Sequence, residues 1–128
     1  MATIVREFRL DRPVDVVWKD FADVGRINKL IDYLGEVTLD GNVRSCSIGD
    51  SGELEELIVS VDQERKRIAY AITRSPFNFQ FHSASMQIVP DGDVACCVWT
   101  TDVLPDSLVG AVTEPIDAAV DSIKSHFA

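Results

Sequence analysis

Residues 106–127 read DSLVGAVTEPIDAAVDSIKSHF, and this stretch decides how the rest of the chain is arranged. Its apolar side chains recur at intervals of three and four residues, which places them on one face of an α-helix. They are Val109, Val112, Ile116, Ala119, Val120, Ile123 and Phe127. An amphipathic helix of this kind needs an apolar surface to lie against. The middle of the chain has to supply that surface.

Pro115 lies inside this helical stretch and has no N–H to donate to the preceding turn. Two arrangements accommodate it. Either the helix kinks at Pro115, or its regular part begins near Thr113 as an N-cap.

Between Gly35 and Leu104 the pattern changes to short runs in which apolar and polar residues alternate. Turn residues separate these runs, at 40–42, 49–52, 62–66, 75–78 and 90–93. They delimit six strands, near residues 34–40, 43–49, 53–62, 67–74, 80–89 and 94–104. Residues 3–11 form a further strand, so we predict one antiparallel sheet of seven strands that holds the C-terminal helix.

Two short helices are predicted between the first strand and the remaining six. Pro13 suits the first turn of a helix, and Gly25 is a residue typical of a helix end. Residues 26–32 then form a second short helix whose apolar side chains turn inward. The chain of 128 residues is long enough for one domain, spanning residues 1–128, and no second domain fits.

Composition excludes several classes of protein. A net charge of −9 disfavours binding to nucleic acid or to anionic lipid surfaces. No apolar run is long enough to span a membrane, and the charged N-terminus does not resemble a secretory signal, so we expect a cytoplasmic protein. The three cysteines, Cys46, Cys96 and Cys97, lack the spacing of a zinc site, and we expect packed thiols.

The hairpin at residues 49–52 predicts which side chains meet across the sheet. With this turn, Cys46 lies opposite Glu55, and Arg44 lies one diagonal step away on the same face. Arg44 and Glu55 could then orient a polar head group, or simply pair with each other. The same face continues along the next two strands with Leu57, Val59, Val61, Ile68, Tyr70, Ile72 and Arg74.

The last two strands add a second set of inward side chains. A two-residue turn at Asp91-Gly92 pairs Ala84 with Trp99. The predicted lining of a cavity between sheet and helix is therefore Arg44, Cys46, Glu55, Val59, Tyr70, Ile72, His82, Met86, Trp99 and Thr101, with Val112 and Ile116 from the helix. Aromatic and methionine side chains on such a face are equally compatible with an ordinary core.

Several short motifs, in this order, resemble those of one superfamily. They are Pro-x-x-Val-Val-Trp at 13–18, Gly-x-x-Arg at 41–44, Gly-x-x-Glu-x-Leu at 52–57, Tyr-x-Ile at 70–72, Ser-Pro at 75–76, Pro-Asp-Gly at 90–92 and a strand tryptophan at 99. With the closing helix, they resemble the SRPBCC, or START/Bet v 1-like, superfamily, and within it the polyketide cyclase/dehydrase branch. The resemblance covers nearly the whole chain.

This resemblance implies an α+β helix-grip fold, in which a seven-stranded antiparallel sheet wraps around a long C-terminal helix and encloses a pocket for hydrophobic molecules. In ligand-gated members the hairpin loops at the pocket mouth act as gates. Here the gate residues would be Asp50, Ser51, Pro76 and Phe77. The chain departs from many relatives at Asn28-Lys29, where they carry a tryptophan, at His82, where they carry a tyrosine, and in lacking a lysine in the strand near 34–40, which disfavours a hormone-receptor carboxylate clamp.

Three functions follow as hypotheses. The first is binding of a small hydrophobic molecule, such as a lipid or polyketide, beneath the C-terminal helix. The second is a cofactor-independent cyclase or dehydratase in which His82 and Tyr70 are catalytic and Arg44 and Glu55 assist. The third is a protein-interaction or co-chaperone domain with a collapsed cavity. The sequence contains no cofactor fingerprint and no metal-ligand spacing, and it leaves a homodimer open.

Overall fold

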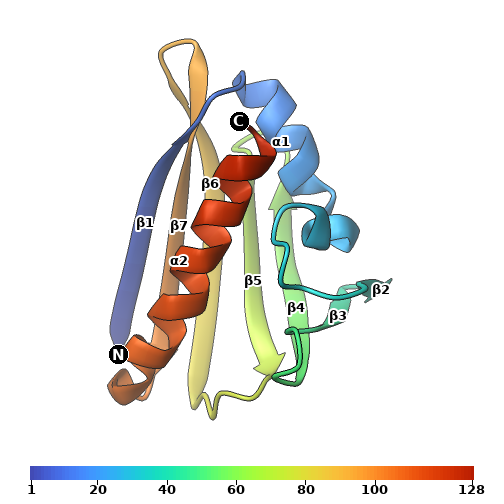
Figure 1. The fold of residues 1–128 in the computed structure, drawn as a ribbon, viewed down its shortest axis with the longest axis vertical. Helices are drawn as coiled ribbons and strands as arrows, with labels where there is room; N and C mark the ends of the chain where they lie inside the picture. Colours follow the sequence, from blue (N-terminus) through green and yellow to red (C-terminus); the bar gives the residue numbers. More distant parts are fainter.

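The computed structural model describes residues 1–128 as a single curved sheet with helices on one face (Figure 1). Its elements are β1 (Ala2–Leu10), α1 (Val14–Ala22), η1 (Val24–Lys29), β2 (Thr38–Asp40), β3 (Val43–Ser47), β4 (Glu53–Asp62), β5 (Arg67–Arg74), β6 (Phe81–Asp91), β7 (Val94–Leu104), η2 (Asp106–Leu108) and α2 (Val109–His126). The seven antiparallel strands are ordered β1-β7-β6-β5-β4-β3-β2. The predicted helix-grip fold is confirmed.

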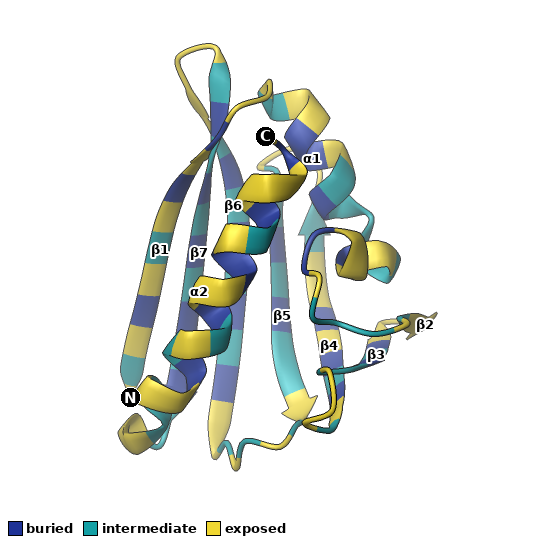
Figure 2. Cartoon of the chain, viewed as in Figure 1, coloured by how far each residue is buried: buried dark blue, intermediate teal, exposed yellow.

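Helix α2 lies across the inner face of the sheet and buries the predicted apolar stripe, except for the half-buried Val109 at its start. In Figure 2 the buried residues are the dark blue segments that recur along the helix between yellow, exposed ones. It is continuous from Val109 to His126, with Pro115 inside it. Thr113 is not an N-cap, because it lies within the helix and its hydroxyl donates to the carbonyl of Val109 at 2.7 Å. The alternative in which the helix begins at Thr113 was therefore wrong.

Helix α1 packs against the C-terminal end of α2. Phe21 of α1 is fully buried and stacks on Phe127 at the end of α2, with ring centroids 6.2 Å apart. The indole N–H of Trp18 donates to Gln63 at 2.8 Å and ties α1 to the β4–β5 turn. Helix α1 ends at Ala22 rather than at Gly25, which lies inside η1.

The predicted register of the β3–β4 hairpin was wrong by one residue. Cys46 pairs with Leu54, and Arg44 pairs directly with Glu56. The connection is a five-residue loop, 48–52, closed by the N–H of Ile48 donating to the carbonyl of Gly52 at 2.9 Å. Because side chains alternate between the faces of a strand, this shift turns every side chain in the first half of β4 to the opposite face.

The first half of β4 therefore presents different residues to the interior from those predicted. Leu54, Glu56 and Ile58 are buried, whereas Leu57 and Val59 are 41% and 61% exposed. The inward placement predicted for Glu55, Leu57 and Val59 was wrong. A β-bulge at residue 59 then restores the alternation, so that Val61 pairs with the buried Ile68.

The predicted register of the β6–β7 hairpin was wrong by two residues. Met86 pairs with Trp99, and Ala84 pairs with Thr101, because the turn is Gly92-Asp93 rather than Asp91-Gly92. A shift of two preserves the face of every side chain. His82, Met86, Trp99 and Thr101 are therefore buried on the inner face, as predicted.

None of the helices is long and apolar enough to cross a bilayer.

Candidate functional site

A cavity of about 560 Å³ lies between the inner face of the sheet and α2. Twenty-six residues line it, and 17 of them are hydrophobic. They come from strands β3 to β7, from the helices after β1, from the segment between η1 and β2, from two hairpin loops and from the first half of α2. The volume and the mostly apolar lining are typical of sites that bind small molecules.

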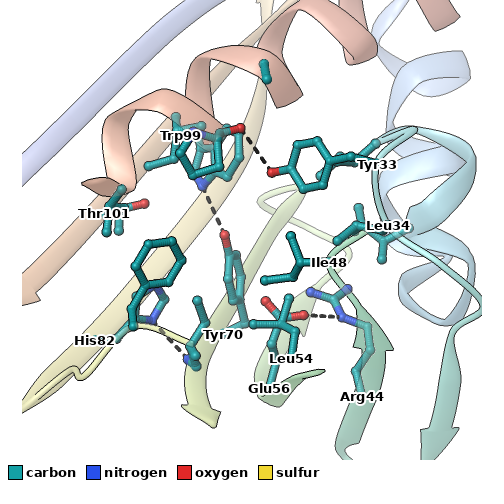
Figure 3. A pocket seen from close by; sticks show the side chains of 18 of the residues that line it. Tyr33, Leu34, Arg44, Ile48, Leu54, Glu56, Tyr70, His82, Trp99 and Thr101 are labelled. Atoms are coloured by element: carbon teal, nitrogen blue, oxygen red, sulfur yellow. Dashed lines mark hydrogen bonds and ion pairs between the residues drawn. The ribbon is translucent and has the colours of Figure 1, made fainter. Parts of the chain in front are cut away.

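A buried ion pair supplies the charge in the cavity wall. Arg44 Nε donates to Glu56 Oε1 at 2.8 Å, and the two side chains are only 5% and 6% exposed (Figure 3). Arg44 also donates to the carbonyl of Val24 at 3.1 Å, and its guanidinium lies 5.6 Å from the centre of the Tyr70 ring. Burying two charges is costly unless they are paired, and here each compensates the other.

The second carboxylate oxygen of Glu56, Oε2, has no hydrogen-bond partner in the chain. It is not sealed in the core, because no side-chain N or O atom without a partner is fully buried. Since Glu56 lines the cavity, this oxygen is available to a group placed there.

Tyr70 points across the cavity toward Trp99, whose indole N–H donates to the Tyr70 hydroxyl at 3.1 Å (Figure 3). Burial, with a smaller contribution from the charge of Glu56, raises the pKa of Tyr70. The phenol therefore stays protonated at neutral pH. Its own proton has no acceptor in the chain and remains available for donation.

His82 is buried on β6 between Tyr70 and Phe79, with ring centroids 5.9 and 5.1 Å away. The backbone N–H of Ile72 donates to its Nδ1 at 2.9 Å, which assigns the ring proton to Nε2. Burial lowers the pKa of His82 to about 4, so the imidazole is neutral at pH 7 and can donate through Nε2–H.

The mouth of the cavity is bounded by α2 and the two predicted gate loops. Tyr33 donates its hydroxyl proton to the carbonyl of Pro115 at 3.0 Å and joins the segment before β2 to α2 (Figure 3). Gly52 has a φ of +138°, and a Cβ there would lie 3.0 Å from Cγ of Pro76, so the two loops approach closely. The exposed Glu114 also lines the mouth.

Most of the predicted lining residues meet around this cavity. Those that line it are Arg44, Tyr70, Ile72, His82, Met86, Trp99, Thr101, Val112 and Ile116, with Ser51, Pro76 and Phe77 of the predicted gates. Cys46 is buried but does not line the cavity, and Glu55, Val59 and Asp50 also lie outside its wall. The first half of β4 contributes Leu54 and Glu56 instead.

Sequence reasoning also missed Tyr33, Leu34, Ile48, Phe79 and Glu114. All of them except Glu114 lie in irregular segments, where alternation along a strand gives no information. Chemistry could have pointed to Glu56. A buried arginine needs a carboxylate beside it, and Glu56, the residue next to Glu55, could equally supply that carboxylate.

Residues 1–127 match the family model described as "Polyketide cyclase / dehydrase and lipid transport". The chain belongs to this family. The predicted resemblance to the SRPBCC, or START/Bet v 1-like, superfamily is thereby confirmed. A search of curated protein sequences found no match to this chain.

Solved structures show the same fold in distant proteins. Protein XoxI from Bacillus cereus is 14% identical, with a TM-score of 0.90 over 99% of this chain and 96% of that one. Major latex-like protein 151 from Panax ginseng is 14% identical, with a TM-score of 0.77 over 98% and 97%. Truncated norcoclaurine synthase from Thalictrum flavum is 16% identical, with a TM-score of 0.74 over 96% and 91%. At these low identities, the comparison shows that this chain shares their fold. A shared fold does not establish a shared activity.

Proposed function

We propose that this protein binds one small, predominantly apolar molecule in the cavity between its sheet and α2. The observation that carries the proposal is the cavity of about 560 Å³, whose wall is apolar apart from a few polar groups. An apolar molecule with one or two polar groups would match both parts of this wall. The alternative of a collapsed cavity in a protein-interaction domain loses its main support, because the interior is open.

Catalysis of a cyclase or dehydratase reaction stays a prediction. With its pKa lowered to about 4, His82 is a weak base at neutral pH, and its Nδ1 already accepts a hydrogen bond from Ile72. The cavity supports ligand binding, but it does not distinguish a carrier from an enzyme, since both need a cavity. Turnover therefore has to be tested after a ligand is found.

The binding test uses native mass spectrometry of freshly purified protein, followed by titration with the uncharged dye Nile red. We expect either a co-purified apolar molecule or saturable dye binding. Ala118 lies at the mouth and lines the cavity although it is exposed, so Ala118→Trp should obstruct entry and weaken dye binding by roughly tenfold or more.

Ala111→Trp is the matched control, because Ala111 is exposed on the same helix and does not line the cavity. This variant should bind the dye as the unmodified chain does. An apo mass without dye binding, or equal binding by both variants, would contradict the proposed function.

A further inference from the structure

We propose that the cavity selects an uncharged head group that carries a hydrogen-bond donor, and that Glu56 is the residue that sets this selection. The inference rests on the proposed function and specifies the chemical class of the ligand. A hydroxyl or a primary amide satisfies it, whereas a carboxylate or a phosphate does not.

The first argument is the charge balance of the wall. Arg44 and Glu56 are both almost completely buried, and they neutralise each other at 2.8 Å. An anionic head group beside them would leave one negative charge uncompensated in a desolvated site. Glu114 at the mouth and the net charge of −9 act in the same direction.

The second argument is the hydrogen-bonding capacity left over in the wall. Glu56 Oε2 is a free acceptor, and only a ligand with an O–H or N–H group can satisfy it. A deprotonated carboxylate has no such group. Leaving this oxygen without a partner once a ligand has displaced water from it would cost affinity.

The third argument is the position of the free donors. The hydroxyl proton of Tyr70 and the Nε2–H of His82 have no acceptor in the chain, and both residues line the cavity. Arg44 Nη2 has no acceptor either, but the charge of Arg44 is already balanced by Glu56. The two neutral donors suit a carbonyl, hydroxyl or ether oxygen on the ligand. A head group that both donates and accepts would therefore engage Glu56 and Tyr70 or His82 together.

Three probes with the same apolar chain test the proposal on the unmodified protein by displacement of Nile red at neutral pH. They are decanol, decanoate and decyl methyl ether. We expect decanol to bind about tenfold or more tightly than either of the others, because decanoate brings a charge and the ether lacks a donor. Equal or tighter binding of decanoate or of the ether would overturn the proposal.

Two variants then test the assignment to Glu56. Glu56→Gln leaves Arg44 as an uncompensated cation in the wall, so the preference should reverse toward decanoate. Glu55→Gln is the matched control, because Glu55 is the neighbouring residue and does not line the cavity, and it should keep the preference for decanol. An unchanged preference in Glu56→Gln would overturn the assignment.

The outcomes separate this inference from the proposed function. If Nile red and all three probes fail to bind, the proposed function fails. If they bind without discrimination, only the inference fails. Should Glu56→Gln not fold, the comparison of decanol with its methyl ether on the unmodified chain still decides whether a donor is required.

Discussion

His82 makes the stability of the protein depend on pH. The folded state holds it neutral, with its pKa lowered to about 4 from an ordinary value of 6.5, because it is buried. Between these two values the unfolded chain binds a proton that the folded chain does not, so stability falls as the pH is lowered through this window. The shift corresponds to a loss of at most about 3 kcal/mol, most of which is reached by pH 4.

Urea denaturation between pH 7 and pH 4 measures this loss. His82→Gln should remove the His82 contribution, so that its free energy of unfolding declines less than that of the unmodified chain over the same range. His126→Gln is the control, because His126 lies at the surface beside Asp20, and it should retain the His82 contribution. Parallel curves for His82→Gln and the unmodified chain would contradict the prediction.

The predictions from sequence were least accurate for individual residues. Alternation along β5, β6 and β7 placed Tyr70, His82 and Trp99 correctly, because an error of two residues in register leaves the faces unchanged. The same reasoning chose Glu55 instead of Glu56, because a loop of five residues cannot be distinguished from one of four by composition alone. One residue in the length of a turn thus decided which carboxylate enters the cavity.

At the scale of elements, α2 carries a defect that can be tested. Pro115 lies inside it and cannot donate to the carbonyl of Ala111, four residues earlier. Pro115→Ala would restore this hydrogen bond and remove the clash of the proline ring. We expect the free energy of unfolding to rise by about 1 to 3 kcal/mol, measured by urea denaturation.

Asp121→Ala, an exposed change in the same helix, is the control and should alter stability by less than about 0.5 kcal/mol. A loss of stability in Pro115→Ala would mean that the contacts of the proline ring at the cavity mouth outweigh the restored hydrogen bond.

Regular elements were predictable because their periodicity reflects one buried face. Helix α2 and strands β4 to β7 begin and end within a few residues of their predicted positions. The exception is β2, which spans only Thr38–Asp40, whereas residues 34–40 were predicted. Before it, Leu34 forms an isolated bridge to Ile48, and the N–H of Gly35 donates to Ser47. Such irregular pairing leaves no periodic pattern in the sequence.

At the scale of the whole molecule, the cavity results from how the layers meet. The main core of 21 buried residues joins α1 and α2 to β1, β6 and β7, while Ile58, Tyr70 and Ala84 form a separate small cluster. The cavity is bordered by residues of both clusters, including Trp99 and Tyr70. The helix-grip fold predicted where a cavity could lie, but whether that cavity is open and how large it is depend on side-chain packing that strand patterns do not specify.

The net charge of −9 is the other property of the whole molecule that can be tested. Excess negative charge destabilises a compact state through self-repulsion, and exposed ion pairs such as Arg9–Asp11 offset little of it. Raising the NaCl concentration from about 10 mM to about 1 M shortens the screening length from roughly 30 Å to 3 Å, so we expect Tm to rise by several degrees.

Glu64 and Asp93 are exposed and form no ion pair. The double variant Glu64→Gln, Asp93→Asn removes two negative charges and should therefore show a smaller rise in Tm. A fall in Tm with added salt would instead mean that the ion pairs outweigh the repulsion.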